Sequence, residues 1–442
     1  MKPLKKIYIG LVALLLVVPL ALFPFVKGES AEKRDLAAFP TLWGEEGINT
    51  AFFSELDTYL ADHLPGRSAI ISLNNLFKAK VFSTSDEEKI VVGREDWLYF
   101  AETLPDYTRE SRLSDGDLDR LITTLSLMRE SVEQAGGTFV FTVAPNKNTL
   151  YPDYMPPYAV ADLPSNLERI SQRLAESGYY TDLLTLREQS EEQLYHKRDS
   201  HWNNLGAYYA FDRLLQTAGQ DNPIPLGPVT WEKSWRGDLE DMIFPALSYM
   251  DDQATVYTDW HYTITSRYRG PEDILITTEN PAVTGNLRMF RDSFGNALLP
   301  YLAESYGTAT FTRAVPYDLQ GVADGDTVML EIVERNIPNL LSSAPVMTAP
   351  TRENVGDATP CDPTRVRTES KGELTHLYGA LPVEAHRVYL QLTNGADTLL
   401  VEAFPIVEKT LADTNTIGGF SAYIPAEYAE YTLTVFVEKE IA

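Results

Sequence analysis

Hydrophobic residues in the middle of the chain alternate between helical and strand spacing. Apolar side chains recur every three or four residues after Ser114, after Ser165 and over 205–217, which predicts three amphipathic helices. Ser114 and Ser165 are expected to cap the first two, because a serine hydroxyl can bind the free N–H groups of a first helical turn. Continuous runs of β-branched and aromatic residues at 138–144 and 327–332 predict buried strands.

Shorter elements complete this alternation. Residues 180–184 and 287–290 are expected to form strands, and 296–306 a helix that Gly307 ends. A turn near 92–100 leads into one more buried strand. Helices and strands that alternate in this way predict an α/β fold, with a mainly parallel sheet flanked by helices.

The pattern changes again after the predicted α/β domain, 91–337. A proline-rich stretch at 338–367 predicts a linker. The remaining residues, 368–442, contain short segments with alternating polarity or with β-branched and aromatic residues, which predict a small β-sandwich module. These segments are 387–392, 398–404, 420–424 and 431–437.

The N-terminal residues have the pattern of a membrane segment. Lys2, Lys5 and Lys6 precede twenty uncharged residues, 7–26. A helix of that length spans a bilayer core of about 30 Å. Residues 23–27 lack a clear small-x-small cleavage site, which favours an uncleaved signal anchor over a cleaved signal peptide.

This pattern also predicts on which side of the membrane the chain lies. The flanking lysines stay in the cytoplasm, so 1–27 is expected to form a cytoplasmic tip and a transmembrane anchor. Residues 28–90 then form a helical juxtamembrane segment. With either an anchor or a cleaved signal peptide, the folded part of the chain is expected on the extracytoplasmic side.

Composition narrows the possible partners. The 442 residues include 63 acidic and 37 basic side chains, a net charge of −26. Such a chain repels phosphate backbones, so nucleic acid is not an expected partner. Cys361 is the only cysteine, which excludes an intrachain disulfide and the paired-cysteine zinc spacings. We expect no metal and no cofactor.

Ser293 stands where an α/β protein can place a nucleophile. It lies between the predicted strand 287–290 and the predicted helix 296–306, and ligands of open α/β sheets gather at the carboxyl ends of strands. The free N–H groups of a helix N-terminus can also stabilise an oxyanion there. A serine at a helix start can equally be a simple cap, so the position alone does not establish catalysis.

A base for this serine is available in a second segment. Asp199 and His201 are two residues apart just before the predicted helix 205–217, and in extended backbone such residues face the same way. An aspartate beside Nδ1–H can hold a histidine in the tautomer whose Nε2 accepts a proton from serine. The alternatives are that Asp199 caps the helix and that His201 is a surface or metal-binding residue. Metal binding is disfavoured, since the nearest other histidine, His196, is five positions away.

Both segments resemble a known family. Phe-Arg-Asp-Ser-Phe-Gly-Asn at 290–296 and Asp-Ser-His-Trp-Asn-Asn-Leu-Gly-Ala at 199–207 are similar to the SGNH hydrolase-like alginate O-acetyltransferase proteins of the AlgX/AlgJ type, and to the related DHHW family. The resemblance implies an SGNH hydrolase-like domain with Asp199, His201 and Ser293 as catalytic triad. This order differs from that of ordinary SGNH esterases, in which the serine comes first.

Weaker matches extend the resemblance over roughly 30–340, and two positions depart from the family pattern. Ser200 replaces the first histidine of the DHHW motif, and Arg291 stands where many SGNH proteins have glycine, which leaves the oxyanion hole undefined. Five residues are candidates for contacting substrate or supporting the triad, although salt bridges or core packing would explain them as well: Lys147, Tyr151, Trp202, Arg291 and Arg335.

The resemblance implies an extracytoplasmic O-acetyltransferase that modifies a cell-surface or exported polysaccharide through an acetyl-serine intermediate. Its implied partners are the polysaccharide, the membrane, and a membrane-bound O-acyltransferase that supplies acetyl groups. Two alternatives stay open. An SGNH-type carbohydrate acetylesterase would use the same triad with water as acceptor, and a catalytically silent glycan-binding scaffold would bind through 368–442 without serine-dependent turnover.

Overall fold

The computed structural model describes residues 36–44, 47–395, 397–411 and 416–438, with a few isolated positions before residue 22. Most of the predicted anchor, 1–27, and the first part of 28–90 lie outside the described residues. In the part that is described, we find no helix with both the length and the apolar character needed to cross a bilayer.

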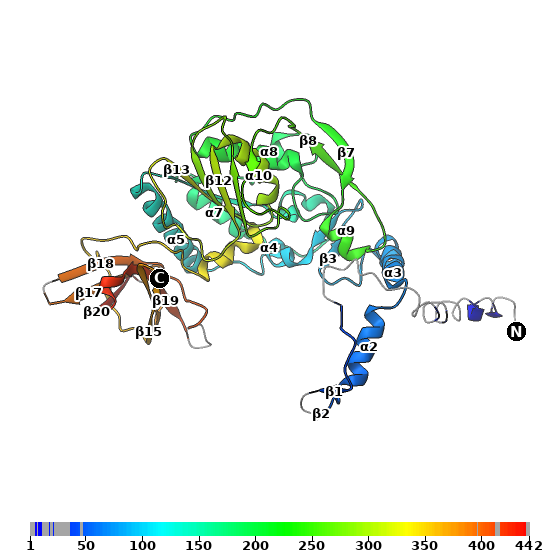
Figure 1. Ribbon diagram of the computed structural model, residues 1–442, viewed down its shortest axis with the longest axis horizontal. Coiled ribbons are helices and arrows are strands. Elements are labelled where there is room, and N and C mark those ends of the chain that lie inside the picture. Colours follow the sequence, from blue (N-terminus) through cyan, green and yellow to red (C-terminus); the bar gives the residue numbers. More distant parts are fainter. Residues whose placement is uncertain are drawn as a thin grey trace.

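A seven-stranded sheet forms the centre of the molecule (Figure 1). Five strands run parallel, from β6 through β5, β13 and β11 to β12; the first four coincide with predicted strands, and β12 was not predicted. The last two, β10 and β9, pair antiparallel at one edge, so the sheet is mainly parallel, as expected. In sheet order the strands are β6 (Tyr180–Thr181), β5 (Thr138–Ala144), β13 (Asp326–Val333), β11 (Asn286–Phe290), β12 (Thr308–Thr312), β10 (Leu275–Glu279) and β9 (Thr263–Ile264).

Helices cover both faces of this sheet. Alternate residues of β13 show the division: Val328 and Leu330 pack with α5 (Asp115–Gln134) and α7 (Asn166–Leu174) on one face. Met329 packs on the other face with α8 (Asn204–Thr217) and α10 (Gly295–Ser305). Ser114 and Ser165 cap α5 and α7 in capping boxes, which confirms the two predicted caps.

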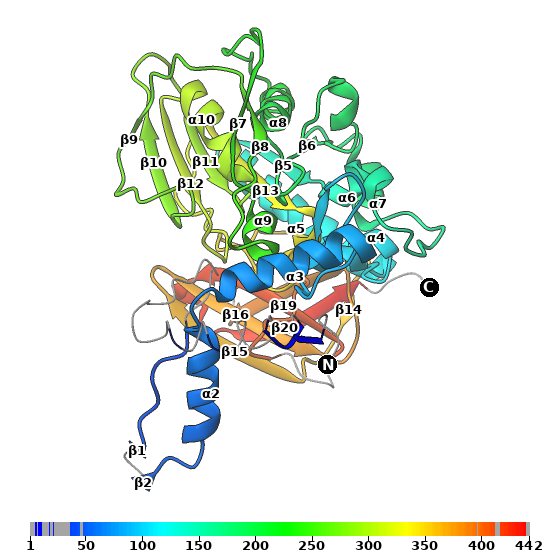
Figure 2. The ribbon, with the colours of Figure 1, turned by 90° about the vertical axis from the view of Figure 1, so that its right-hand side faces the viewer.

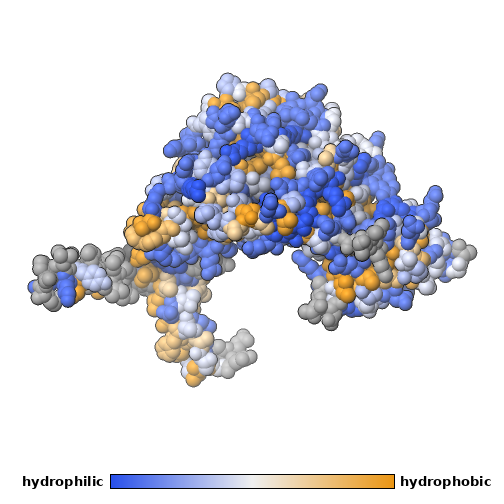
Figure 3. Space-filling model, turned by 180° about the vertical axis from the view of Figure 1, so that it is seen from behind, coloured by the Kyte–Doolittle hydropathy of each residue, from blue (hydrophilic) through white to orange (hydrophobic). Residues whose placement is uncertain are grey.

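An N-terminal arm projects from this domain (Figures 1 and 2). It consists of the short pair β1 (Trp43–Gly44) and β2 (Gly47–Ile48) and helix α2 (Phe52–Asp62). Figure 3 shows hydrophobic residues on the surface of the arm. Phe53 and Leu60 of α2 are among its exposed apolar side chains. Helix α3 (Arg67–Phe82) follows and packs against the domain, where Asn75 donates to the Ile243 carbonyl at 2.9 Å. Helix α3 leads into the hairpin β3 (Ile90–Val92) and β4 (Leu98–Phe100), at the turn predicted near 92–100.

Shorter elements connect these layers. The helical ones are η1 (Ala101–Thr103), α4 (Leu104–Thr108), α6 (Lys147–Leu150), η2 (Pro152–Tyr154), η3 (Leu186–Gln189) and α9 (Asp238–Ile243). The antiparallel pair β7 (Thr230–Trp235) and β8 (Asp251–Thr255) lies in the region whose pattern predicted no regular element.

Two further sheets form the C-terminal part. One has the order β14, β20, β17, β18 and the other β15, β16, β19, and their facing side chains share one core. The pattern predicted β17, β18, β19 and β20 and missed β14, β15 and β16. All seven residues of β15 are exposed, so that strand carries no hydrophobic signal. The bounds are β14 (Thr359–Pro360), β15 (Arg365–Lys371), β16 (Leu374–Leu381), β17 (Arg387–Asn394), β18 (Asp397–Ala403), β19 (Gly418–Pro425), η5 (Ala426–Tyr428) and β20 (Thr432–Glu438).

The residues between the central sheet and these strands are packed. They begin with η4 (Glu334–Leu341), and Val346 and Met347 are buried in the same cluster as α5 and Tyr423. The Arg352 guanidinium donates hydrogen bonds to Glu130 of α5 and to Glu402 of β18, at 2.6 and 2.7 Å. The domain limits expected from the sequence, including a linker at 338–367, stay a prediction.

Candidate active site

The two segments singled out in the sequence meet above the sheet. Ser293 lies in the turn between the end of β11 and the start of α10, and Asp199 and His201 lie in the loop that enters α8. Asn203 caps α8, because its Oδ1 accepts from the N–H groups of Leu205 and Gly206 at 3.0 Å. The cap fixes the loop against the helix only two residues after His201.

Asp199, His201 and Ser293 form one chain of hydrogen bonds. His201 Nδ1 lies 2.6 Å from Asp199 Oδ1, and His201 Nε2 lies 2.8 Å from Ser293 Oγ. When Nδ1 carries the proton and donates to Asp199, Nε2 is free to accept from the serine hydroxyl. The arrangement is that of a serine nucleophile, its base, and a carboxylate that orients the base.

Both oxygens of Asp199 are used. Oδ1 also accepts from the backbone N–H of His201 at 2.8 Å, and Oδ2 accepts from Trp235 Nε1 at 2.9 Å and from the N–H of Asp238 at 3.0 Å. Burial opposes the charged form of Asp199, but His201 and these donors outweigh it and hold its pKa below the ordinary value. Asp199 therefore stays ionised in the neutral range.

His201 shows the reciprocal effect. Burial disfavours the charged form of His201. The charge of Asp199 and its hydrogen bond to His201 together outweigh burial, so the pKa of His201 is raised above 6.5. The imidazole can therefore hold a proton that it takes from Ser293.

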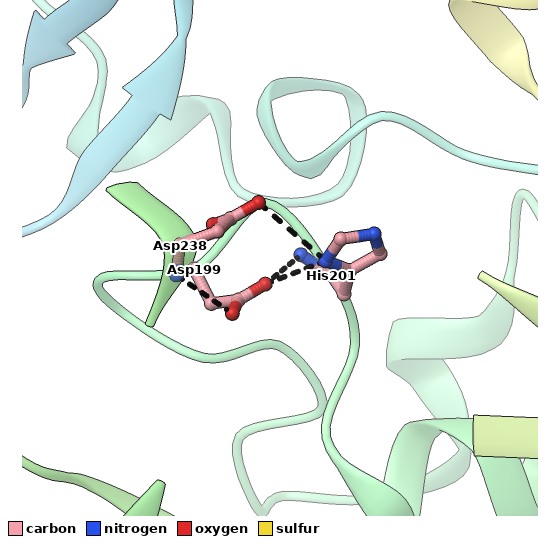
Figure 4. Close-up of side chains that lie close together, drawn as sticks. All are labelled: Asp199, His201 and Asp238. Atoms are coloured by element: carbon pink, nitrogen blue, oxygen red, sulfur yellow. Dashed lines mark hydrogen bonds and ion pairs between the residues drawn. The ribbon is translucent and has the colours of Figure 1, made fainter. Parts of the chain in front are cut away.

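Asp238 is a second carboxyl group beside His201, and no local pattern in the sequence pointed to it. Its Oδ2 lies 3.7 Å from His201 Nδ1 and accepts a hydrogen bond from Ser200 Oγ at 2.6 Å. Figure 4 shows how Asp199 and Asp238 lie beside His201. Asp238 begins α9 and Trp235 ends β7, in the stretch predicted to be irregular. Gly237 allows this close approach, because a Cβ there would lie 2.0 Å from the Arg198 carbonyl oxygen.

These groups also bear on metal binding. Asp199, His201 and Asp238 offer atoms within 4.8 Å of one another, the one such trio among the residues that the structure describes. The atoms of this trio are already used in hydrogen bonds: Asp199 binds His201 and Trp235, and Asp238 binds Ser200. A cation here would have to displace the Nδ1 proton that Asp199 holds, and the site therefore fits a triad better than a metal centre.

The turn that carries Ser293 is held by buried charged groups. Asp292 Oδ1 accepts from Phe294 N–H at 3.0 Å, and Oδ2 accepts from Val333 N–H at 2.7 Å. Arg291 is buried and donates to the carbonyls of Asp292 and Pro271 and to Asn296 Oδ1. The candidate Arg291 thus stabilises the turn from within.

Two other predicted residues lie behind the triad rather than in contact with substrate space. Lys147 is buried, and its Nζ donates to the carbonyls of His196, Lys197 and Asp199 at 3.1, 3.0 and 2.6 Å. Burial lowers its pKa to about 8. Tyr151 is buried as well, and its hydroxyl accepts from Leu194 N–H at 2.9 Å, so both side chains hold the loop that carries Asp199.

The remaining two candidates differ. Trp202 is buried under the site, where its Nε1 donates to the Phe294 carbonyl at 3.1 Å and so ties the His201 loop to the Ser293 turn. Arg335 lies in η4, with its guanidinium 5.5 Å from the ring centre of Phe100. It does not line the cavity at Ser293.

That cavity has a volume of about 670 Å³, and Ser293 and His201 both line it. Its wall also includes residues that the sequence did not single out: Trp235, Arg236, Asp238, Glu272, Asn296 and Arg313. They come from β7, α9, α10 and the loops before β10 and after β12. A nucleophile that opens into a space of this size can reach an acyl donor and a sugar-sized acceptor.

Comparison with known proteins supports the resemblance. Residues 90–242 match the family described as an SGNH hydrolase-like domain of the acetyltransferase AlgX. The "Probable alginate O-acetylase AlgJ" of Pseudomonas syringae is 25% identical over 197 residues, which cover 43% of this chain and 49% of that protein. The chain is a relative of the AlgX/AlgJ-type proteins.

A second relative is similar to the same extent. The "Probable alginate O-acetylase AlgJ" of Pseudomonas fluorescens is 25% identical over 228 residues, 50% of this chain and 54% of that protein. The chain thus spans about half the length of the relatives that it matches.

Solved structures include the O-acetyltransferase domain of Pseudomonas putida AlgJ, with 19% identity, a TM-score of 0.38, and coverage of 56% of this chain and 92% of that one. A DHHW family protein from Eubacterium siraeum has 18% identity, a TM-score of 0.38, and coverage of 52% and 89%.

Proposed function

We propose that this chain is an O-acetyltransferase that modifies a polysaccharide, with Ser293 as nucleophile, His201 as general base and acid, and Asp199 as the group that orients His201. The observation that carries the proposal is the continuous set of hydrogen bonds from Asp199 to Ser293, at 2.6 and 2.8 Å, at the wall of a cavity. The likeness to proteins named alginate O-acetylases supports acetyl transfer as the reaction.

The reaction has two steps. Ser293 Oγ attacks the carbonyl carbon of an acetyl ester while its proton moves to His201 Nε2, and that proton then passes to the departing oxygen of the donor. The result is acetyl-Ser293. In the second step a sugar hydroxyl gives its proton to His201 and attacks the acetyl carbon, and Ser293 recovers the proton as the ester forms.

Each intermediate carries a negative oxygen that needs hydrogen-bond donors. Phe294 N–H is already bound to Asp292. In the first turn of α10, an eleven-residue helix that begins two residues after Ser293, the N–H groups of Asn296 and Ala297 make only long hydrogen bonds, to the carbonyls of Ser293 and Phe294 at 3.2 and 3.4 Å. These N–H groups and the positive end of the helix dipole supply the stabilisation in this proposal.

The proposed setting is the extracytoplasmic side of a membrane. The lysine-flanked apolar run at 7–26 anchors the chain, and a membrane-bound O-acyltransferase supplies the acetyl groups. A fusion of the chain to alkaline phosphatase at the C-terminus, which is active only outside the cytoplasm, tests the orientation. An inactive fusion protein of normal abundance contradicts it.

Intact-mass analysis tests the mechanism. The full chain in detergent is mixed with 4-nitrophenyl acetate, and the wild type is compared with Ser293→Ala and with Ser305→Ala, a control at the other end of α10. We expect an acetyl adduct or nitrophenolate release in the wild type and the control, and neither in Ser293→Ala. Equal turnover in all three proteins refutes Ser293 as nucleophile.

The same assay separates the alternatives. An acetylesterase releases acetate at a rate that added oligosaccharide does not change, whereas a transferase moves the acetyl group to the sugar. A silent glycan-binding protein shows no serine-dependent turnover at all.

A further inference from the structure

The cavity at Ser293 contains arginines, but each is already paired within the protein. Arg313 forms an ion pair with Glu272, and Arg236 forms one with Asp241. The side chains of Arg313 and Arg236 are only 28% and 34% exposed, so both are held against these carboxylates. A carboxylate on a substrate would have to compete with a protein carboxylate for either guanidinium.

Carboxyl groups outnumber guanidinium groups on the cavity wall. Asp199, Asp238 and Glu272 face Arg236 and Arg313. Burial and the nearby Asp199 raise the pKa of Asp238. With a proton on Asp238 and with His201 neutral, the form in which it acts as base, the wall is neutral rather than positive. The net charge of the whole chain, −26, adds long-range repulsion of polyanions.

Trp235 provides a surface of a different kind. It lines the cavity and is 39% exposed, although tryptophan is usually buried. One ring face stacks on the buried His196, with ring centres 5.0 Å apart and planes 5° apart, and Nε1 donates to Asp199. The ring is therefore fixed in place, and an exposed, rigid aromatic ring suits the apolar face of a pyranose.

From these observations we infer that the acceptor sugar at Ser293 is uncharged: the cavity binds a neutral glycan that stacks on Trp235, and it excludes sugars that carry carboxylate, phosphate or sulfate. This inference rests on the proposed function, and it names the acceptor class for that site. Alginate, the polymer in the names of the relatives, is a polyuronate. The acceptor of this chain accordingly differs in charge from that polymer.

The test compares two acceptors that differ only in their carboxylates. A β-1,4-linked mannuronate pentamer and its carboxyl-reduced form, a mannose pentamer, are each supplied with 4-nitrophenyl acetate and the full chain, and acetylated sugar is measured by mass spectrometry. We expect kcat/KM for the reduced pentamer to exceed that for the uronate by at least about 10-fold, a difference of about 1.4 kcal/mol.

Equal or better transfer to the uronate overturns the inference, and so does transfer to neither sugar while Ser293-dependent release of nitrophenolate continues. Both of these results leave the triad intact. If the wild type shows no turnover that depends on Ser293, the proposed function itself is refuted, and the acceptor assignment with it.

A pair of variants tests the physical reason. Glu272→Gln frees Arg313 and removes a negative charge from the cavity, whereas Glu279→Gln makes the same charge change at an exposed position of β10 outside it. We expect Glu272→Gln to shift the ratio of kcat/KM values toward the uronate by about 5-fold or more, as for other close charge changes. The control leaves the ratio unchanged. Equal ratios in both variants contradict the argument from paired arginines.

Discussion

Asp199 illustrates how one side chain can be committed to four hydrogen bonds. Oδ1 faces the backbone N–H and Nδ1 of His201, and Oδ2 faces Nε1 of Trp235 and the backbone N–H of Asp238. A carboxylate accepts all four, but an amide offers one oxygen and an NH₂ group that would face two donors. The residue is therefore specified as aspartate by its surroundings.

Asp199→Asn should consequently be severe. The amide would favour the wrong imidazole tautomer, and kcat for Ser293-dependent ester hydrolysis should fall by about 10⁴-fold, as expected for a triad aspartate. The steady-state rate with 4-nitrophenyl acetate measures it. Asp212→Asn on the outer part of α8 is the control, and a loss of less than about 10-fold in Asp199→Asn would contradict the assigned role.

The raised pKa of His201 predicts a pH profile. The base must be neutral to accept the serine proton, so kcat/KM should rise with pH, with a midpoint above 6.5. The carboxylate of Asp238, 3.7 Å from His201 Nδ1, contributes to raising the pKa of His201. Asp238→Asn should therefore lower the pKa of His201 and move the rising limb to lower pH.

The measurement is kcat/KM against pH for the wild type and Asp238→Asn, with Asp241→Asn as the matched control on the same helix. Asp241 pairs with Arg236 rather than with His201. A limb that stays in place or moves to higher pH in Asp238→Asn refutes the assignment.

At the scale of elements, the loop before α8 and the turn before α10 are held from below. Lys147 donates to three carbonyls of the loop before α8, and Trp202 connects this loop to the turn before α10. Gly295 is required at the start of α10, since a Cβ there would lie 2.7 Å from Arg291 Cβ and Cδ. These contacts decide where Asp199 and Ser293 stand, without any contact with substrate.

Lys147→Met tests this positioning role. The variant leaves three carbonyls of the loop without their donor, so we expect about 2–3 kcal/mol less stability and a clear loss of acylation rate. KM for the ester should change little, since Lys147 does not line the cavity. Denaturant unfolding and burst kinetics measure the two effects. A raised KM with an unchanged acylation rate would instead indicate direct contact with substrate.

At the scale of the whole molecule, the C-terminal sheets are tied to the α/β domain by Arg352, whose side chain is 22% exposed. It contacts Glu130 at 2.6 Å and Glu402, which is fully buried, at 2.7 Å. Tyr423 and Phe404 enter the core under α5 as well. The β-rich part therefore contributes to the core of the α/β domain.

Arg352→Met should destabilise the protein by about 1–2 kcal/mol, because it removes one of the two arginines that pair with the buried Glu402, while Arg387 still contacts it at 3.0 Å. Thermal or denaturant unfolding measures the loss. Arg367→Met, on the exposed strand β15, serves as control. Serine-dependent ester hydrolysis by Arg352→Met should persist at temperatures where the variant is folded. Unchanged stability would show that the ion pairs do not couple the two parts.

Much of the architecture could be predicted because it depends on local chemistry. Capping serines, helical periodicity and buried β-branched runs placed α5, α7, β5 and β13, and each of these signals lies within one segment. The pattern also missed β10, β12 and β16, although each of these strands has buried residues. It failed as well for the short, partly exposed β9 and for β15, which is exposed throughout. Strands without a buried face have no hydrophobic alternation to detect.

The sequence by itself determined the segments that carry the chemistry, since an aspartate and a histidine two residues apart and a serine at a strand-to-helix turn are local features. Only the tertiary structure decided that Ser293 lies 2.8 Å from His201, that Lys147, Tyr151 and Arg291 act as supports, and that Trp235 and Asp238 join the site. Those relations depend on how distant segments pack, because hydrogen bonds and charge pairing act over a few ångströms in space regardless of separation along the chain.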